Sequence, residues 1–451
     1  MNKETFINLF KDEINDYIVN GKRYVNLDSA ATTPPLKAVQ DGVDDYLVSY
    51  GSVHRGAGEK SKVSTDIYEK SRQVIKDFVG APTGSYVIFS GNTTGGMNIL
   101  AHFFSHLDGK VAVSSIEHSS SWLPWIKAEG ERSLNSRMVT SLNDMGFVND
   151  LIQKNGNSQV LRYCLNGKGE FDLKQIEKLL RENKIKVFVL TASSNLTGYC
   201  PDIQKIGKLV HKYEAYYVVD GCQYIQHHSI NMSEMGIDFL VASGHKFYAP
   251  YGGGFVVGPK IFLDQFLPYQ IGGGNLPYIT SDGEFLRYEN NLAHDPGTPN
   301  AVGAVSMAAA LSELKRIGIN NIEKYETGLT RQAYDGLAKI KNVKLLVNGK
   351  QLTTVIPFII DGIDSEAVAE KLNNDFGIGV RAGNFCVYHV VRDLLKITPE
   401  QEKAIIRDVK RGETGNMPGV VRASFSICND SEDVTRFIGA VEEIAQRKNK
   451  K

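Results

Sequence analysis

Apolar runs and helical patterns alternate through the middle of the chain. The runs 187–190 and 216–219 are apolar at every position, and between them lies a helical pattern that we expect to start at Pro201. An earlier helical pattern begins at Asp172, a residue type suited to capping a helix N-terminus. A strand that is apolar throughout has both faces buried, which is typical of a parallel sheet covered by helices. The pattern therefore predicts an α/β fold with a mainly parallel sheet.

Polar side chains follow three of these predicted strands. Asn195 comes shortly after the first strand, Asp220 directly follows the second, and Lys246 comes after a third apolar run at 239–242. Such sheets bind ligands at the carboxyl ends of their strands. A lysine there can form a Schiff base with a carbonyl cofactor, and a carboxylate can pair with a protonated pyridine nitrogen. Taken singly, an exposed surface lysine and a capping aspartate are the ordinary alternatives.

Two segments rich in small residues lie near predicted strands. Residues 90–98 join the strand-like run 86–89 to an apolar stretch, and such a helix start can bind an anion through its N–H groups and hydroxyls. An ordinary helix N-cap is the alternative, because the segment matches neither GxGxxG nor a P-loop. The glycine run 252–254 indicates a tight turn between strands.

Composition excludes several classes of protein. The 451 residues carry 51 Lys+Arg and 51 Asp+Glu, so nothing favours nucleic acid or an anionic membrane as a partner. No apolar segment is long enough to span a bilayer, and the first 13 residues lack a signal-type apolar core, so we expect a cytoplasmic protein. The five cysteines and ten histidines show no metal-ligand spacing, and we expect no metal site. After residue 300 the pattern changes to two helices and short strands, which predicts a second, smaller α+β domain.

Short motifs occur in a specific order along most of the chain. By these motifs it resembles the class V, aspartate-aminotransferase-like branch of pyridoxal-phosphate enzymes, and within it the cysteine desulfurases of the SufS/selenocysteine-lyase type. The motifs are Leu27-Asp28-Ser29-Ala30-Ala31-Thr32-Thr33, Val53-His54-Arg55-Gly56, Asn92-Thr93-Thr94, Glu117-His118-Ser119, Ser194-Asn195, Asp220-Gly221-Cys222-Gln223, Ser243-Gly244-His245-Lys246, Gly297-Thr298-Pro299-Asn300, Arg381-Ala382-Gly383 with Cys386, and Arg422-Ala423-Ser424.

The resemblance implies a fold and a set of cofactor contacts. We expect a large pyridoxal-phosphate-binding domain at 36–300 with a mainly parallel seven-stranded sheet, a small C-terminal domain at 301–451, and an N-terminal segment, 1–35, packing on the small domain. Lys246 would form the Schiff base, Asp220 would pair with the pyridinium nitrogen, and His118 would stack on the ring and assist proton transfer. The other cofactor-binding residues would be Asn195 and Gln223 at the phenolic oxygen, Thr93, Thr94, Ser243 and His245 at the phosphate, and Thr298 reaching it from a second protomer of a homodimer.

The resemblance also implies substrate contacts. Arg422 would bind the substrate α-carboxylate, with Asn195 nearby. Arg381 and Arg55 would line the substrate channel, Arg55 from across the dimer interface. Cys386, five residues after Arg381, occupies the place of the family's nucleophilic cysteine.

The sequence departs from the family pattern in two places. Asn384 and Phe385 precede the cysteine where such relatives often carry histidines, and a charged insert spans 394–421, with a helix start at Thr398.

The activity implied is that of an L-cysteine desulfurase, which moves sulfur from L-cysteine to Cys386 as a persulfide and releases L-alanine, with a protein as possible sulfur acceptor. One alternative keeps the cofactor but is an aminotransferase, C–S β-lyase or epimerase of another amino acid, with Cys386 not catalytic. A second is a nonenzymatic cofactor-binding or scaffold protein, which would need none of Lys246, Asp220, His118 and Arg422.

Overall fold

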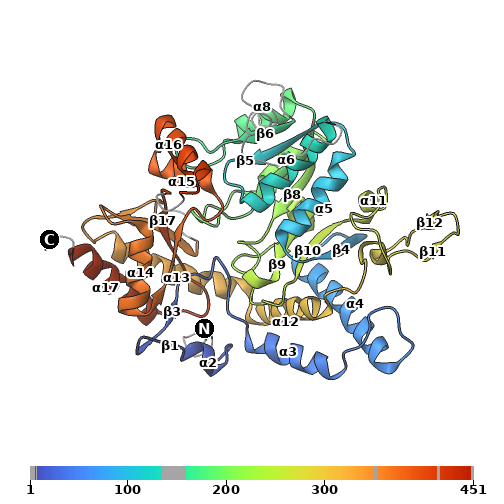
Figure 1. The fold of residues 1–451 in the computed structure, drawn as a ribbon, viewed down its shortest axis with the longest axis horizontal. Helices are drawn as coiled ribbons and strands as arrows, with labels where there is room; N and C mark the ends of the chain where they lie inside the picture. The colour runs from blue at the N-terminus through green and yellow to red at the C-terminus, as the bar shows by residue number, and fades with distance from the viewer. Residues whose placement is uncertain (1–5, 7, 135–158, 350–352, 414–416, 448–451) are drawn as a thin grey trace. The chain divides into compact units, whose positions relative to one another are not determined.

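The computed structural model describes residues 6, 8–134, 159–349, 353–413 and 417–447 (Figure 1). The chain divides into two compact units. The first, here called the sheet unit, comprises Pro35–Ala192 and Pro201–Ile319. The second, the terminal unit, comprises Met1–Pro34, Ser193–Cys200 and Asn320–Lys451. No helix among the described residues is both long and apolar enough to cross a lipid bilayer.

A seven-stranded sheet forms the centre of the sheet unit, in the order β4-β10-β9-β8-β7-β5-β6. Strands β5 to β9 run parallel, whereas β10 is antiparallel to both of its neighbours. This confirms the predicted α/β fold and its mainly parallel seven-stranded sheet. The strands are β4 (Ser85–Ser90), β5 (Lys110–Ser114), β6 (Val160–Tyr163), β7 (Ile185–Thr191), β8 (Tyr216–Asp220), β9 (Phe239–Ser243) and β10 (Gly254–Pro259).

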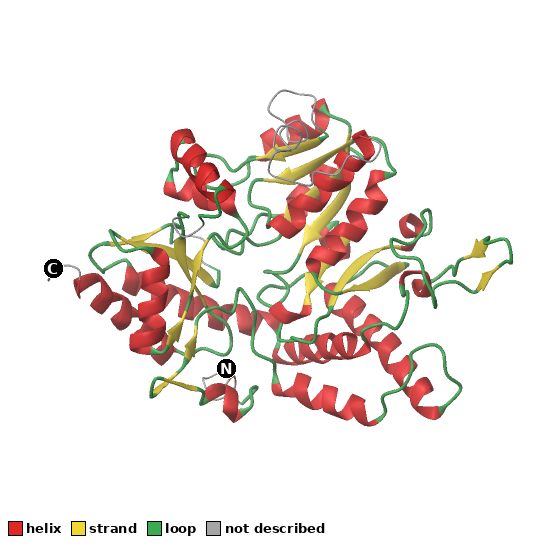
Figure 2. Ribbon diagram, in the orientation of Figure 1, coloured by secondary structure: helices red, strands yellow, loops and turns green. Residues whose placement is uncertain are grey.

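Helices flank this sheet, as Figure 2 shows. Alternate residues of the strands face opposite sides: Val189 and Val218 pack into a core with α5 and α6, while the rings of Phe188 and Tyr217 lie on the other side. The helices are α3 (Lys37–Val48), α4 (Glu59–Val79), α5 (Thr93–Ser105), α6 (Ser119–Leu134), α8 (Leu173–Glu182), α9 (Ile203–Lys212), α10 (Met232–Met235), α11 (Lys260–Leu263) and α12 (Ala301–Ile317), with 3₁₀ turns η2 (Gly244–Lys246) and η3 (Asn291–His294) and a hairpin β11 (Tyr278–Ile279)–β12 (Phe285–Leu286).

The terminal unit contains a four-stranded antiparallel sheet, β13-β14-β17-β16, packed against helices. Near the N-terminus, β3 pairs in parallel with β15 of the same unit. The elements are α2 (Asp12–Asn15), β1 (Ile18–Val19), β2 (Lys22–Arg23), β3 (Val25–Asn26), α13 (Ile319–Leu337), β13 (Val343–Leu345), β14 (Val355–Ile360), α14 (Ser365–Phe376), β15 (Ile378–Gly379), β16 (Arg381–Gly383), α15 (Tyr388–Leu395), α16 (Pro399–Lys410), β17 (Val420–Ser424) and α17 (Ser431–Arg447).

Capping side chains fix several helix starts. Asp172 caps α8 as predicted, and Thr398 forms a reciprocal capping box with Gln401 at α16, inside the charged insert. The start predicted at Pro201 is wrong by two residues, because Asp202 caps the helix through the backbone N–H of Lys205.

The boundary between a large domain at 36–300 and a small domain at 301–451 remains a prediction. Helix α12 packs against α3 and α4, and it therefore belongs to the sheet unit, although it follows residue 300.

Candidate functional site

One edge of the large sheet gathers most of the polar residues that the sequence singled out. Strands β4, β5, β7, β8 and β9 point the same way, so their carboxyl ends lie at one edge. Asn92 and Thr93 follow β4, His118 follows β5, Asp220 ends β8, and Lys246 follows β9. The topology thus brings together side chains that lie more than 150 residues apart in the sequence.

Asp220 is buried at the end of β8 and held by two donors. The backbone N–H of Cys222 donates to Oδ1 at 3.0 Å, and the hydroxyl of Ser121 donates to Oδ2. Among the described residues, no lysine or arginine forms an ion pair with this carboxylate. Gln223, also buried, follows three residues later. The sequence did not single out Ser121, because nothing in its local pattern shows that the first turn of α6 lies beside β8.

Glu117 is a second buried carboxyl group at this edge. Its Oε1 accepts hydrogen bonds from the Ser114 hydroxyl and the Thr191 backbone N–H, both at 2.6 Å. The pKa of Glu117 is raised to about 8, chiefly by burial and also by the charge of Asp220, while the two hydrogen bonds oppose the shift. Glu117 is therefore mostly a neutral acid at neutral pH.

His118, the next residue, is held in one ring orientation. Its Nδ1 accepts a hydrogen bond from the backbone N–H of Ser120 at 3.1 Å. In the neutral ring this places the proton on Nε2. The ring is half-buried and stands at the start of α6, where we expected a residue that assists proton transfer.

Lys246 lies in η2, and its charge acts on two neighbours. The pKa of His245 is lowered to about 4, chiefly by burial and also by the charge of Lys246. Burial raises the pKa of Cys222 to about 12, with Asp220 raising it and Lys246 opposing. Since the charges of Asp220 and Lys246 both act on Cys222, the amine and the carboxylate share one electrostatic neighbourhood.

The N-terminus of α5 lies at the same edge of the sheet. Asn92 caps the helix by accepting from the Gly95 N–H, as the N-cap interpretation predicted. The Thr93 backbone N–H donates to the Ser243 hydroxyl at 2.8 Å, which ties the helix start to the end of β9. The Thr94 hydroxyl is exposed and bonds to Ser120. Backbone N–H groups, hydroxyls and the helix dipole together suit a phosphate.

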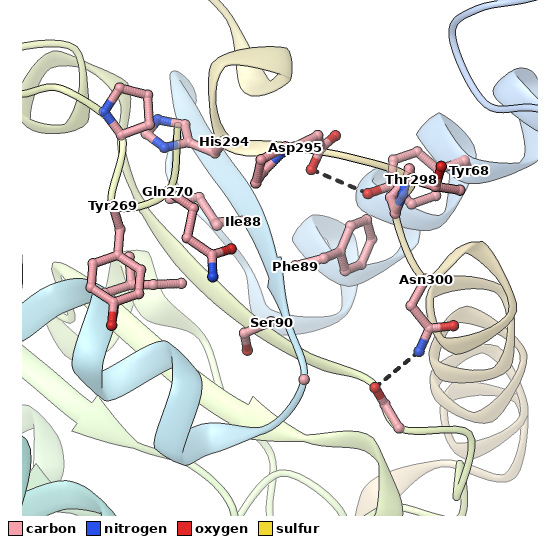
Figure 3. Close-up of a pocket in the computed structure, with 16 residues that line it drawn as sticks. Tyr68, Ile88, Phe89, Ser90, Tyr269, Gln270, His294, Asp295, Thr298 and Asn300 are labelled. Atoms are coloured by element: carbon pink, nitrogen blue, oxygen red, sulfur yellow. Dashed lines mark hydrogen bonds between the residues drawn. The ribbon is translucent and has the colours of Figure 1, made fainter. Parts of the chain in front are cut away.

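Thr298 lies on the wall of a pocket of about 230 Å³ that is also lined by Ser90, Gln270 and Asp295 (Figure 3). Arg55 donates to the backbone carbonyl groups of Gly273 and Gly297, next to Thr298, so it binds the loop that carries this threonine.

A possible metal-ligand group also lies in the sheet unit. His54, Glu69 and Asp295 offer ligand atoms within 4.8 Å of one another. Asp295, however, already has a cationic partner, because it forms a buried ion pair with Arg72.

Arg422, in the terminal unit, is buried and contacts several polar groups of the same unit. Its Nη2 pairs with Asp28 at 2.7 Å, and its Nη1 donates to the backbone carbonyl of Asn195 at 3.0 Å. Its Nε is buried and has no hydrogen-bond partner among the described residues. Burial lowers the pKa of Arg422, Asp28 opposes this, and the like charge of Arg381 adds to it. Arg381 is its cross-strand neighbour between β16 and β17.

Cys386 lies next to residues that contact this arginine. Phe385 packs its ring 4.8 Å from the Arg422 guanidinium carbon, and its backbone carbonyl accepts from the Asn195 side chain at 2.9 Å. Burial raises the pKa of three other cysteines, to about 12 for Cys200 and Cys222 and about 11 for Cys428, so these thiols are poor nucleophiles.

Comparison with known proteins identifies the family. The family model described as aminotransferase class-V matches residues 25–154 and 145–437. The chain belongs to this family. This confirms the resemblance found in the sequence.

Named relatives and a solved structure are cysteine desulfurases. A probable cysteine desulfurase of Mycolicibacterium paratuberculosis is 30% identical over 95% of this chain, and the match spans only 56% of that relative's length. One of Vibrio cholerae serotype O1 is 27% identical, covering 94% of both chains. The apo structure of cysteine desulfurase from Thermococcus onnurineus NA1 superposes with a TM-score of 0.77 at 28% identity, covering 94% of this chain and 95% of that one.

Proposed function

We propose that this chain is a pyridoxal-phosphate-dependent L-cysteine desulfurase. The overall reaction converts L-cysteine and the Cys386 thiol into L-alanine and a Cys386 persulfide. Relatives and a structural neighbour that are named cysteine desulfurases support this activity. The observation that carries it is the contact between Phe385 and Arg422, because it links the thiol-bearing loop to the guanidinium expected to bind a carboxylate.

The residues of the sheet unit suit pyridoxal phosphate. Asp220 is a buried carboxylate fixed by two donors and without an ion-pair partner among the described residues, so a cationic ring nitrogen would supply its missing counter-charge. Thr93 and Thr94 at the start of α5 would hold the phosphate. Ser243, His245, Gln223 and Thr298 are the further candidates for cofactor contacts.

The cofactor, when bound, withdraws electrons from the substrate's Cα. Arg422 orients the substrate through its carboxylate, and Lys246 takes the Cα proton. The Cys386 thiolate attacks the substrate sulfur, so that an S–S bond forms as the C–S bond breaks. The electron pair of the broken bond stays with the substrate, where protonation of Cβ yields the methyl group, and return of the proton from Lys246 to Cα completes alanine.

We also propose a homodimer in which Thr298 and the loop bound by Arg55 serve the site of the partner copy. The hairpin β11–β12 supports self-association, because Tyr278, Ile279 and Leu286 are each about 60% exposed. A protein that takes the persulfide sulfur would be a second partner.

The activity is tested by substituting the cysteines one at a time. The unsubstituted protein, supplied with L-cysteine, should release alanine and carry a persulfide on Cys386. Cys386→Ala should keep the yellow colour of bound cofactor but lose alanine production by several orders of magnitude. Cys164→Ala is the matched control, since Cys164 is exposed outside the site. Near-normal alanine production by Cys386→Ala would exclude the nucleophile role, and inertness of the unsubstituted protein towards L-cysteine would favour an aminotransferase or epimerase.

A further inference from the structure

The segment that carries the cysteine has a strained backbone. Phe385 and Cys386 have φ of 55° and 57°, so two consecutive residues with side chains occupy the left-handed region. Residues other than glycine enter this region at a cost, and they stay there only where surrounding contacts hold them. The backbone conformation at Cys386 sets the direction in which its side chain leaves the chain.

The backbone N–H of Val387 donates to the carbonyl of Asn384 at 2.9 Å and closes the turn around these two residues. Phe385 adds further contacts that hold the turn. It is 4% exposed, its ring lies on the Arg422 guanidinium, and its carbonyl accepts from the Asn195 amide. Asn195 is itself tied to Arg422 through its own backbone carbonyl. The three residues therefore form a closed set of contacts, with the cysteine one residue beyond it.

Phe385 differs from an ordinary core residue. Phe385 is buried, but it lies outside the main hydrophobic cluster of the terminal unit, which includes Phe358, Phe425 and Phe437. Its ring instead covers a cation, an arrangement stabilised by the negative face of the aromatic ring. Strand β16 ends at Gly383 and α15 begins at Tyr388, so between them lies a short connection anchored by this ring.

We propose that Phe385 is a positioning residue that holds the Cys386 thiol in place by packing on Arg422. The inference rests on the proposed function, in which Cys386 receives the substrate sulfur. Arg422 keeps its bonds to Asp28 and Asn195 without the ring, so loss of the ring affects placement of the thiol more than binding of the carboxylate.

The test compares Phe385→Leu, which keeps bulk but removes the ring, with Phe385→Tyr, which keeps the ring. Phe376→Leu is the matched control, because Phe376 also packs against a cation, Lys22, in the same unit. Alkylation of Cys386 by iodoacetamide is followed by peptide mass spectrometry without substrate. We expect the alkylation rate to change at least threefold in Phe385→Leu and less than twofold in Phe385→Tyr and in the control.

Turnover of L-cysteine provides the second readout. In Phe385→Leu, kcat should fall about tenfold while KM stays within twofold. In Phe385→Tyr, which keeps the ring, kcat should stay close to that of the unsubstituted protein. Unchanged alkylation and kcat in Phe385→Leu, or a loss carried by KM, would overturn the proposal. If Phe385→Leu does not fold, Phe385→Met serves as the ring-free variant. An unsubstituted protein that makes no alanine refutes the proposed function, and the alkylation series then decides the role of Phe385 alone.

Discussion

Glu117→Gln tests whether the site contains a neutral buried acid. Glutamine has the shape of the protonated side chain and keeps an oxygen for the Ser114 and Thr191 donors. The native pKa of about 8 lies above the ordinary value of 4.5. The unfolded chain therefore releases the proton at lower pH than the folded chain does. The favourable contribution of Glu117 is complete below pH 4.5 and is lost as the pH rises through 8.

The size of the effect follows from this difference. One pKa unit corresponds to about 1.4 kcal/mol, so the full shift is worth roughly 5 kcal/mol. Between pH 6 and pH 8 the wild type should lose about 2 kcal/mol of its free energy of unfolding through this group, by the same linkage. Glu117→Gln lacks the titration, so its stability relative to wild type should rise by that amount over the same interval.

Urea unfolding followed by tryptophan fluorescence measures this difference in unfolding free energy for the sheet unit, which contains Glu117. The only two tryptophans, Trp122 and Trp125, both lie in α6, which begins two residues after Glu117. Both proteins are compared at saturating pyridoxal phosphate. Glu177→Gln is the control, because the hydrogen bond from Lys212 lowers the pKa of Glu177 and its titration ends below this pH range. A difference between Glu117→Gln and wild type that stays constant from pH 6 to 8 would show that Glu117 is ionised in the fold.

Three further results are expected. Lys246→Ala should abolish the yellow colour and turnover without unfolding the chain; borohydride trapping and peptide mapping check this, and cofactor on another lysine would refute it. Mixed Lys246→Ala and Thr298→Ala protomers should regain activity as heterodimers, whereas a fully active monomer in sedimentation would exclude shared sites. Gly254→Ala should weaken cofactor binding in a fluorescence titration, because a Cβ there would lie 2.7 Å from Cα of Asn92, the cap of α5; unchanged affinity would show that the helix start adjusts.

Local patterns in the sequence were sufficient to predict the sheet and several helix ends. The apolar runs of β7, β8 and β9 identify buried parallel strands, and Asp172 and Thr398 identify helix starts through bonds within three residues. The helix start predicted at Pro201 is wrong because the neighbouring Asp202 caps the helix, which begins at Ile203.

Local sequence patterns could not predict the contacts that hold the candidate site residues in place, because these contacts join residues far apart in the sequence. Asp28 and Arg422 are 394 residues apart, and Ser121 and Asp220 are 99 apart. In the sequence, Phe385 differs from its surroundings only as a departure from the family pattern. Its contact with Arg422 depends on how the terminal unit folds. The family motifs selected the residues of the site, whereas these contacts depend on the tertiary structure.

The charges around Arg422 favour an anionic substrate. Arg381 and Arg422 are cross-strand neighbours, a placement of like charges that is destabilising unless anions compensate it. Asp28 supplies one negative charge to Nη2, and the buried Nε remains without a partner among the described residues. In the proposed function, the substrate carboxylate would supply the second negative charge. These charges therefore support the proposal that Arg422 binds the carboxylate of an amino acid, and the Cys386 thiol in the same unit supports the proposed sulfur transfer.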